Sequence, residues 1–590
     1  MANSSGIDRW IPGIGVARGY KAAWLWPDVR AGIVVTALLI PAGMGYAEVA
    51  GLPPETGLYA TIVPLVAYAI FGPSRILVLG PDSSLAPIIA AAILPLALAD
   101  GQRAVALAGL LAIMVGALLL LGGILRLGFV TDLLSKPIRV GYLNAIAVLV
   151  IVSQIPKLLG FSTDASGVWR ESVAIVQAIA AGEVLPLAAV FGILSLVVIF
   201  VLKAVKSPIP GVLVVVVLSM ILTGMLGLSD ALPVVGALPQ GLPAPALEGL
   251  QWSDVAALAG PAAGIALVAF TDSAVLSRTF AARRGESVSG SQEMAGIGLA
   301  NIAGGVLGGF PISASSSRTP VAEQAGSRTQ LTGVVGAALI LGFILLAPGL
   351  TEFLPSTVLA AVVMSAATSL IDVRGFRTLW RMDRLDAGLS LAAFLGVLIV
   401  GVLEGIVVAI ILSLLAFVNR SWRPYKAELG RVEGLRGYHD LSRYPDRGER
   451  IPGIVIVRFD APLFFANGGV FDDWVRERVT AAQPGVHTVI LAAEPMTDID
   501  TTAIDELVEL DEYLKVHGIR LLIAEMKDPV KDTLREYGMT DRFTPDRFAP
   551  TVGAAVDELT GELRSDLEGT KWDDDGPEPG PHASPTDGSR

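Results

Sequence analysis

Residues 308–319 (GGFPISASSSRT) place two glycines, a proline and four serines inside a long apolar region. The core of a bilayer tolerates polar, non-helical backbone only where protein buries it or where it lines a cavity. We therefore expect a spanning segment to break here and to restart as a half-helix. The restarted end offers free N–H groups, serine hydroxyls and the positive end of the helix dipole, which together favour a bound anion.

A second polar break, residues 80–84 (GPDSS), interrupts the apolar sequence in the first half of the chain. Two broken helices at corresponding positions mark the binding site of many secondary transporters. The two breaks together predict a membrane carrier for an anion.

Composition separates a membrane part from a soluble part. The chain is 53% hydrophobic and 17% charged, whereas soluble domains carry about 25% charged residues. Charges are sparse from about residue 31 to residue 417, and the sequence after residue 419 is typical of a soluble α/β protein. There is no cysteine, and all four histidines lie beyond the apolar region. Proton or cation coupling within the membrane must therefore use carboxylates, and we expect no metal or other cofactor.

The sequence lacks the motifs of serine hydrolases, P-loop NTPases and zinc proteases. We therefore expect no enzyme activity.

Apolar stretches predict about fourteen spanning segments, because a spanning helix needs about 20 apolar residues and a broken one needs fewer. They form two sets of about seven, and an odd number per set inverts the second set relative to the first. The fold class is thus a polytopic α-helical membrane protein with two inverted repeats, followed by a C-terminal α/β domain. The predicted segments are residues 31–50, 57–71, 84–99, 104–121, 129–152, 184–202, 209–228, 255–273, 289–307, 314–326, 330–347, 356–371, 386–401 and 403–418.

We expect both termini on the cytoplasmic side of the inner (plasma) membrane. An even number of spans puts the two ends on one side, and basic residues gather on the cytoplasmic side. Basic residues follow the twelfth and the last predicted span: Arg374, Arg377, Arg381, Arg384, Arg420, Arg423 and Lys426. The N-terminal residues lack the features of a cleaved signal peptide.

These patterns predict the domain organisation. Alternating strands and helices between residues 454 and 537 suit one small α/β domain. The expected parts are a cytoplasmic lead-in at residues 1–28, a transport domain at 29–420, a linker at 421–450, an α/β domain at 451–562 and a disordered acidic tail at 563–590.

The serines and the arginine of the second break are the leading candidates for an anion site. Ser315, Ser316 and Ser317 would donate hydrogen bonds, and Arg318 would supply positive charge. A cation in the first turn of a helix opposes the helix dipole, so Arg318 needs an anionic partner or ligand. The alternative is that the serines cap a kinked helix while Arg318 pairs or reaches towards the interface.

Two acidic residues have distinct predicted roles. Asp82 in the first break is a natural N-cap for the third span, where it would aim the remaining N–H groups of that half-helix at the ligand. Asp272 follows the apolar run 264–271, and an acid at bilayer depth is functional by default. We expect it to take up a proton or a cation; the alternative is a structural pair with Arg278 or Arg318.

Short motifs then carry a family resemblance. In order along the chain they are residues 40–47 (IPAGMGYA), 51–54 (GLPP), 57–59 (GLY), 78–82 (VLGPD), 208–211 (PIPG), 298–301 (GLAN) and 317–319 (SRT). This order resembles that of the SulP (sulfate permease) family of anion transporters. The resemblance implies a homodimer in which a core domain moves against a gate domain. It implies a pocket lined by Tyr46, Asp82, Ser83, Ser84, Ala314, Ser315, Ser316, Ser317 and Arg318.

The resemblance also makes Asp272 the coupling-ion residue, since the eighth span often carries Glu in proton-coupled members and Asp in sodium-coupled bicarbonate members. Two positions depart from the family pattern. Ala42 stands where many members have Gln, which removes one polar contact from the pocket. Leu276 offers no oxygen where sodium-coupled members can supply a hydroxyl, which disfavours sodium.

The soluble part resembles a STAS domain in residues 458–467 (RFDAPLFFAN) and 497–502 (TDIDTT). Asp500, Thr501 and Thr502 match the loop that carries a phosphorylatable serine in anti-sigma-factor antagonists, which makes them candidate regulatory residues. A packing and trafficking role for the domain is the alternative.

The sequence predicts secondary transport of a small inorganic anion, with sulfate as the leading substrate and proton symport through Asp272 as the preferred coupling. Its expected partners are the anion, a proton or sodium ion, the lipid bilayer and a second copy of the chain, but no nucleic acid. Sodium-coupled uptake of bicarbonate or a dicarboxylate is the main rival. A membrane sensor or scaffold that presents the STAS domain, and an uncoupled anion channel, also stay open.

Overall fold

A computed structural model describes residues 11–128, 135–163, 165, 167–205, 207, 209–241, 244–245, 247–482 and 485–561. The chain forms two compact units, Met1–Leu414 and Leu415–Arg590. The first ten residues of the predicted lead-in, residues 129–134 of the fifth predicted segment and the whole predicted acidic tail lie outside the described residues.

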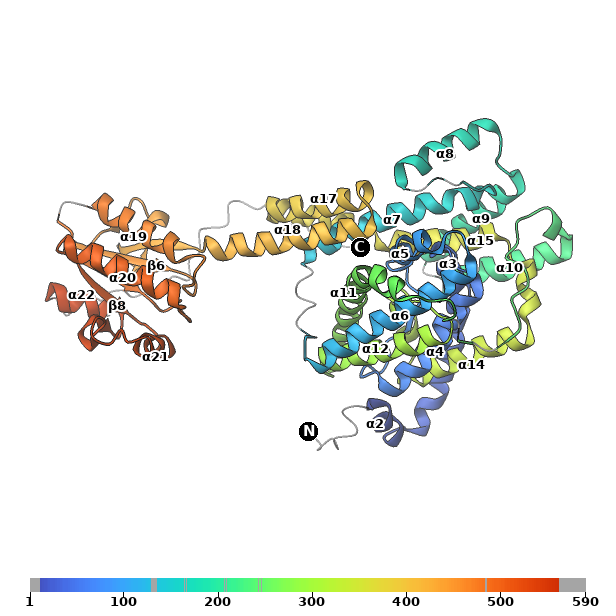
Figure 1. Ribbon diagram of the computed structural model, residues 1–590, viewed down its shortest axis with the longest axis horizontal. Coiled ribbons are helices and arrows are strands. Elements are labelled where there is room, and N and C mark those ends of the chain that lie inside the picture. The colour runs from blue at the N-terminus through green and yellow to red at the C-terminus, as the bar shows by residue number, and fades with distance from the viewer. Residues whose placement is uncertain are drawn as a thin grey trace, which may run out of the picture. The chain divides into compact units, whose positions relative to one another are not determined.

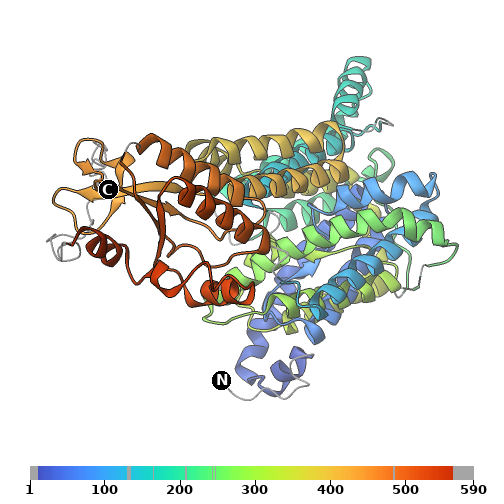
Figure 2. The ribbon, with the colours of Figure 1, turned by 60° about the vertical axis from the view of Figure 1, so that its left-hand side comes forward.

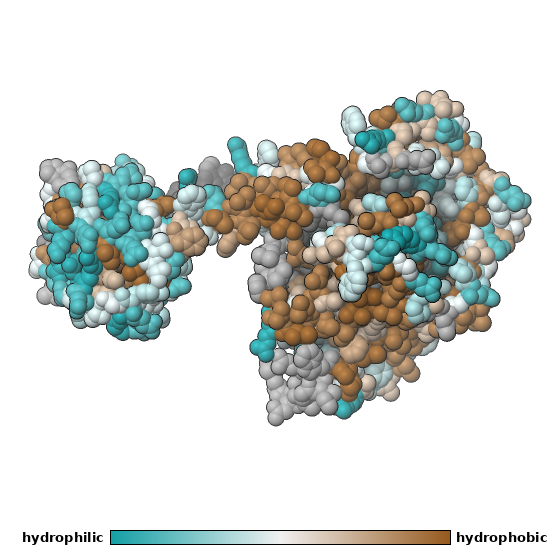
Figure 3. Space-filling view, in the orientation of Figure 1, coloured by the Kyte–Doolittle hydropathy of each residue, from teal (hydrophilic) through white to brown (hydrophobic). Residues whose placement is uncertain are grey.

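The first unit is a bundle of helices (Figures 1 and 2). Its surface is extensively apolar, whereas that of the second unit is mainly hydrophilic (Figure 3). In chain order the helices are α2 (Pro12–Arg18), α3 (Leu25–Val49), α4 (Pro54–Phe71), α5 (Ala86–Ala97), α6 (Gly101–Ile124), α7 (Lys136–Leu159), α8 (Val168–Ala181), α9 (Pro186–Ala204), α10 (Gly211–Leu226), α11 (Trp252–Arg283), α12 (Gly290–Val306), α13 (Arg318–Gln324), α14 (Leu331–Leu346), α15 (Ser356–Ala367), α16 (Val373–Met382), α17 (Arg384–Ile399) and α18 (Val402–Trp422).

Each of the fourteen predicted segments overlaps one of these helices, and several of the helices extend beyond the predicted bounds. Among the described residues, seven helices are long and apolar enough to cross a membrane: Ala22–Val49, Pro54–Phe71, Gly101–Ile124, Lys136–Leu159, Pro186–Ala204, Trp252–Arg283 and Ser356–Met382. The last of these stretches runs through α15 and α16. Shorter apolar stretches, as broken or tilted segments are, are Ala86–Ala97, Gly211–Leu226, Leu331–Leu346 and Val407–Trp422 within α18. Two helices that the sequence did not separate, α8 and α16, lie between the fifth and sixth and between the twelfth and thirteenth segments.

Helix packing follows the two predicted sets of seven. Helix α3, the first of the first set, packs on α14, the fourth of the second set. In the same way α11, the first of the second set, packs on α6, the fourth of the first set. Helix α7, the fifth of the first set, packs on α17, the sixth of the second set. Likewise α15, the fifth of the second set, packs on α9, the sixth of the first set. Helices of the first half of the chain (blue to cyan) therefore lie between helices of the second half (green to yellow) in Figures 1 and 2. Exchanged pairs of this kind are what a two-fold repeat produces.

Helices α6 and α12 approach each other closely enough for their backbones to touch. A Cβ atom on Gly116 would lie 2.5 Å from the Gly298 carbonyl oxygen, and one on Gly298 would lie 2.7 Å from the Gly116 carbonyl oxygen. Two helical turns away, Gly109 and Gly305 face each other with corresponding distances of 2.8 Å and 2.5 Å. Small residues allow such close approach between membrane helices, where dispersion contacts replace the hydrophobic effect.

The second unit is an α/β domain. Its sheet contains β3 (Lys426–Val432), β4 (His439–Asp440), β5 (Gly448–Glu449), β6 (Ile454–Phe459), β7 (Thr488–Ala492), β8 (Arg520–Ala524) and β9 (Phe548–Ala549). The strand order is β4-β3-β6-β7-β8-β9, and β5 pairs with β3. Strands β6 to β9 are parallel, whereas β3 is antiparallel to β6. Because β3 pairs along β6, the sheet begins inside the range assigned to the linker.

Helices cover both faces of this sheet. Valines 455 and 457 of β6 point to the face covered by α19 (Gly468–Ala482), α20 (Thr501–Val516) and α21 (Asp528–Glu536). The alternate residues Ile454 and Ile456 point to the other face, which α22 (Val552–Thr560) covers. The alternation of side chains along a strand explains why continuous apolar runs here are buried strands.

The α6–α12 contact generates a stability prediction. Gly116→Val should lower the free energy of unfolding by about 2 kcal/mol, because the new side chain overlaps the α12 backbone. The matched control is Gly342→Val on α14, since a Cβ atom there meets nothing within 4 Å. Thermal unfolding of the purified protein in detergent measures both. Equal stability of the two variants would contradict the backbone contact.

Candidate anion site

The two polar breaks meet as a short antiparallel strand pair in the bundle. Strand β1 (Leu79–Gly80) pairs with β2 (Ser313–Ala314), with Leu79 opposite Ala314 and Gly80 opposite Ser313. The Ser315 N–H extends the pairing by donating to the Val78 carbonyl at 3.0 Å. Residues more than two hundred positions apart therefore share one site.

Side chains from α11 and α12 satisfy the outer edge of this strand pair. The Ile312 N–H donates to Asn301 Oδ1 at 2.9 Å, and Asn301 Nδ2 donates to the Ile312 carbonyl at 3.2 Å. The Ala314 N–H donates to Ser273 Oγ at 2.9 Å. Asn301 and Ser273 are fully buried, so these bonds replace the water that backbone groups would otherwise need.

Each break is followed by a half-helix, α5 or α13. The prediction that Asp82 is the N-cap of the third span is wrong in register, since α5 begins at Ala86 and its N-cap is Leu85. Asp82 instead holds the preceding turn, where its Oδ1 accepts from the Ser84 N–H at 3.0 Å and from Ser84 Oγ at 2.9 Å. Its carbonyl accepts from the N–H groups of Leu85 and Ala86. Asp82 therefore organises the start of α5 from three residues before the N-cap.

Arg318 is the first residue of α13 and is only 3% exposed. Its Nη2 donates to the Pro81 carbonyl in the opposite break. Its Nε and Nη1 have no hydrogen-bond partner in the described part of the chain. No carboxylate of the described residues lies within ion-pair distance of Arg318, so the alternative of a pair with Asp272 finds no contact. A buried guanidinium with free donors requires a ligand or water.

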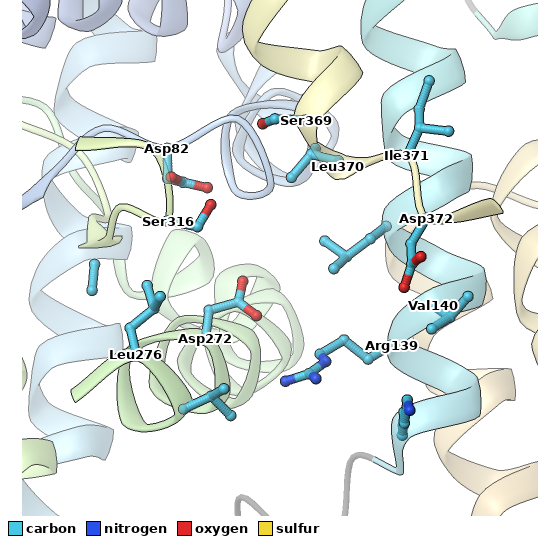
Figure 4. A pocket seen from close by; sticks show the side chains of 14 residues that line it. Asp82, Arg139, Val140, Asp272, Leu276, Ser316, Ser369, Leu370, Ile371 and Asp372 are labelled. Carbon is cyan, nitrogen blue, oxygen red and sulfur yellow. The ribbon is translucent and has the colours of Figure 1, made fainter. Parts of the chain in front are cut away.

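A cavity of about 460 Å³ opens beside the two breaks (Figure 4). Asp82, Asp272 and Ser316 lie on one side of it, and Arg139 from α7 lies on the other. Ser84 Oγ donates to Asp272 Oδ2 at 3.3 Å, which links the coupling candidate to the first break. The complete lining is Asp82, Lys136, Arg139, Val140, Leu143, Asp272, Val275, Leu276, Ala314, Ser316, Ser369, Leu370, Ile371 and Asp372.

A second cavity of about 290 Å³ is bordered by the first turn of α13. Tyr46, Ser317 and Arg318 line it, together with Ala42 and Lys203. Ser369 borders both cavities. The departure of Ala42 from the family pattern thus falls in this second cavity, where it adds an apolar wall.

The predicted site residues consequently separate into three groups. Asp82, Ala314, Ser316 and Asp272 line the first cavity, and Tyr46, Ser317 and Arg318 line the second. The remaining three are buried: Ser83, Ser84 and Ser315. Ser315 Oγ accepts from the Arg318 N–H at 3.3 Å, so it satisfies the first N–H of α13, whose N-cap residue is Ser317.

Sequence reasoning missed the basic residues of α7. Lys136 and Arg139 bring two positive charges to the wall of the first cavity opposite Asp272. A signal was present, because a basic residue inside an apolar segment points to a functional site by default. Arg139 has that position, one turn inside the helix that begins at Lys136.

In the C-terminal unit, Asp500 is the N-cap of α20 and accepts from the Ala503 N–H at 2.9 Å. Its other oxygen accepts from the Phe465 N–H at 2.8 Å, which links the loop between β6 and α19 to the loop before α20. Thr501 and Thr502 are exposed in the first turn of α20.

Comparison with known proteins decides the family. Residues 25–393 match the Sulfate permease family, and residues 448–555 match the STAS domain. The chain belongs to the sulfate permease family. The resemblance inferred from the sequence motifs is therefore confirmed, as is the fold class of a helical transmembrane part followed by a STAS domain. Members of this family are membrane transporters of anions.

Two relatives named as sulfate transporters match most of the chain. A "Probable sulfate transporter" of Mycobacterium tuberculosis is 38% identical over 551 residues, covering 93% of this chain and 97% of its own length. Chloroplastic sulfate transporter 4.1 of Arabidopsis thaliana is 31% identical, covering 93% of this chain and 82% of its own.

Two solved structures share the fold. The inward-facing murine Slc26a9 anion transporter superposes with a TM-score of 0.86 at 22% identity, covering 95% of this chain and 96% of its own. The transmembrane domain of the cyanobacterial bicarbonate transporter BicA gives a TM-score of 0.58 at 23% identity, covering 67% of this chain and 98% of its own.

The support of the strand pair by Asn301 is testable. Asn301→Ala leaves the N–H and carbonyl of Ile312 without partners, so it should lower the free energy of unfolding by about 2 kcal/mol. We also expect anion uptake to fall on the order of tenfold, because α13 loses its alignment. Thermal unfolding and uptake into proteoliposomes measure the two effects. Asn419→Ala, at an exposed position of α18, is the control and should change neither.

Proposed function

We propose that this protein is a secondary transporter that imports sulfate together with protons and has no enzyme activity. The observation that carries the proposal is the buried guanidinium of Arg318, which has free donors at the start of a half-helix. The relatives named as sulfate transporters support sulfate as the anion.

The anion would bind where the starts of α5 and α13 converge. Helix N-termini present free N–H groups and a partial positive charge. The exposed hydroxyls of Ser316 and Ser317 add hydrogen-bond donors in the first and the second cavity respectively, and Arg318 adds a full positive charge. A doubly charged oxyanion gains more from these groups than a monovalent one, which favours sulfate over bicarbonate.

Asp272 would carry the coupling proton. It lies within hydrogen-bond distance of Ser84, which belongs to the break that would bind the anion. Protonation removes a negative charge next to the incoming anion and needs no further ligand. A hard metal cation needs several oxygen ligands, and Leu276 in the same wall provides none.

The assembly and orientation complete the proposal. We assign both termini to the cytoplasm of an inner (plasma) membrane, following the basic residues after the even-numbered spans. We propose a homodimer in which the helices around α11 move as a core against a gate that contains α7. The domain boundaries at residues 28, 420, 450 and 562 stay a proposal, with β3 as the first strand of the STAS sheet.

Coupling through Asp272 predicts a specific loss. In proteoliposomes with an inward proton gradient, wild-type protein should accumulate labelled sulfate, whereas Asp272→Asn should not. Sulfate exchange without a gradient should persist in the variant, because the neutral side chain resembles the protonated carboxyl. Glu404→Gln, which removes an exposed carboxylate from another apolar helix, is the control.

The same assay separates the rivals. Sodium-driven uptake of bicarbonate, or of a dicarboxylate, would replace the proposal with that activity. Binding of sulfate without flux would favour a sensor or scaffold, and conductive flux without accumulation would indicate a channel.

Binding through Arg318 predicts a loss of affinity. Arg318→Ala should weaken sulfate binding by roughly 10- to 100-fold, because a hydrogen bond to a charged group contributes about 1.5–3 kcal/mol. Equilibrium binding of labelled sulfate to purified, monodisperse protein measures this change. The control is Arg283→Ala, which removes a surface arginine paired with Glu323 at 3.2 Å. Unchanged affinity in a folded Arg318→Ala protein would remove Arg318 from the site.

We propose a regulatory role for the Asp500–Thr502 loop as a secondary function. Phosphate on Thr501 or Thr502 would sit at the positive end of α20, next to the Asp500 cap. Thr501→Glu should change the uptake rate whereas Thr480→Glu, on the exposed face of α19, should not. Equal rates would leave the domain a packing and trafficking role.

A further inference from the structure

We propose that α16 and the apolar groove beside it bind an anionic phospholipid of the cytoplasmic leaflet. The groove is distinct from the first cavity of the candidate anion site but shares Ile371 with its wall. The inference depends on the proposed orientation of the chain, but it holds whichever anion the protein carries.

Helix α16 has two chemically opposite faces. Arg374, Arg377 and Arg381 follow the spacing i, i+3, i+7, which places them on one face. Phe376 and Leu379 lie on another face, in one apolar cluster with Val140 of α7 and Ala387 of α17. A short helix with a basic face and an apolar face is typical of one that lies in the membrane interface.

The arginines of this helix make no ion pair within the part of the chain that the structure describes, although Asp372 and Asp383 lie at the two ends of the helix. Arg374, Arg377 and Arg381 are exposed, as is Arg384 at the start of α17. None of the four makes an ion pair or a side-chain hydrogen bond within the described part of the chain. Four positive charges beside a bilayer attract anionic headgroups.

Apolar side chains continue from α16 towards the lipid. Trp380 is 56% exposed and Val373 is 52% exposed, and both lie at the border of the arginine face. Tryptophan favours the headgroup level of a membrane, with its ring in the apolar layer. These residues fix the depth at which the arginines would meet lipid phosphates.

The groove next to α16 suits an acyl chain. It has a volume of about 260 Å³ and lies between α7, the start of α16 and α17. Phe376, Leu391 and Phe394 are among its apolar lining residues. The full lining is Gly141, Asn144, Val148, Ile371, Val373, Phe376, Ser390, Leu391 and Phe394.

Charge decides between a lipid and a second copy of the chain as the occupant. A two-fold symmetric interface places each surface patch against its own copy. Docking this face against itself would bring the four arginines of both copies together, and α16 carries no acidic residue between Asp372 and Asp383 at its two ends. A lipid supplies a phosphate for the arginine face and a chain for the groove, so it complements both features.

A bound lipid would contact the wall of the first cavity. Ile371 lines both the groove and that cavity, and Asp372 lines the cavity. The Asp372 N–H donates to Asn144 Oδ1 at 2.9 Å, which ties the start of α16 to α7. The lipid would therefore brace the segment at the mouth of the anion path.

The test uses the full-length purified protein and native mass spectrometry with added phosphatidylglycerol or phosphatidylcholine. We expect wild-type protein to prefer phosphatidylglycerol. Three arginines at a membrane surface contribute about fivefold each, so R374Q/R377Q/R381Q should weaken phosphatidylglycerol binding on the order of 100-fold. R374K/R377K/R381K should retain the preference. K515Q/K527Q/K531Q, which removes the same charge from the soluble unit, should leave binding unchanged.

A groove variant separates the acyl chain from the headgroup. Leu391→Trp should weaken binding of both lipids several-fold by filling the groove while keeping the preference for phosphatidylglycerol. Size-exclusion profiles and thermal unfolding verify that each variant is folded. Equal binding of both lipids by wild type, or a preference that survives R374Q/R377Q/R381Q, would overturn the proposal. A Leu391→Trp protein that changes its oligomeric state but not its lipid binding would instead assign the groove to a second copy.

Discussion

Polar backbone inside a bilayer must find its partners within the protein, and this chain meets that requirement by pairing β1 with β2. Without the pairing, the N–H and carbonyl groups of both breaks would be buried without partners. Asn301 and Ser273 complete the pairing from the neighbouring helices. Once the backbone is satisfied, α5 and α13 can begin deep in the bundle, and their N-termini become available to a ligand.

The charges around the breaks depend on that arrangement. Arg318 reaches across to the Pro81 carbonyl, so the guanidinium belongs to both breaks at once. Asp272 comes from α11, which packs with α5, α6, α12 and β2. Arg139 comes from α7, which packs with α9, α15, α16 and α17. The acid and the base on opposite walls of the cavity therefore belong to different groups of helices, and movement of one group against the other would change their separation.

Close packing gives the first of these groups its rigidity. The glycine pairs of α6 and α12 bring backbone against backbone, so the two helices cannot slide without overlap. Helix α12 also carries Asn301, which holds Ile312 before β2. The glycines thus connect helix packing to the position of the anion site.

Much of the fold could be read from the sequence because it rests on local chemistry. Long apolar runs require helices in lipid, and glycine, proline and serine clusters break them, so the fourteen segments and both breaks follow from residue type alone. The same holds for the strands and helices of the C-terminal unit. Helices α8 and α16 were missed because each is short and only one face is apolar, which leaves no continuous apolar run.

The details of the candidate site could not be predicted from the sequence. Asp82 looked like an N-cap, yet the turn at 83–85 moves the start of α5 to Ala86. Ser316 and Ser317 are neighbours in the chain but face two cavities, because successive residues at a helix start point in different directions. Arg139 and Asp272 lie 133 positions apart, so only the tertiary structure reveals that they line opposite walls of one cavity.

The sequence by itself determined the membrane region, the two breaks, the family and the residue types available to bind an anion. The tertiary structure decided which of those residues meet, which are buried to hold the strand pair, and which charges remain unpaired. The physical reason is that hydropathy and backbone preferences act over a few residues. Hydrogen-bond partners and cavity walls come from segments that meet only after the chain has folded.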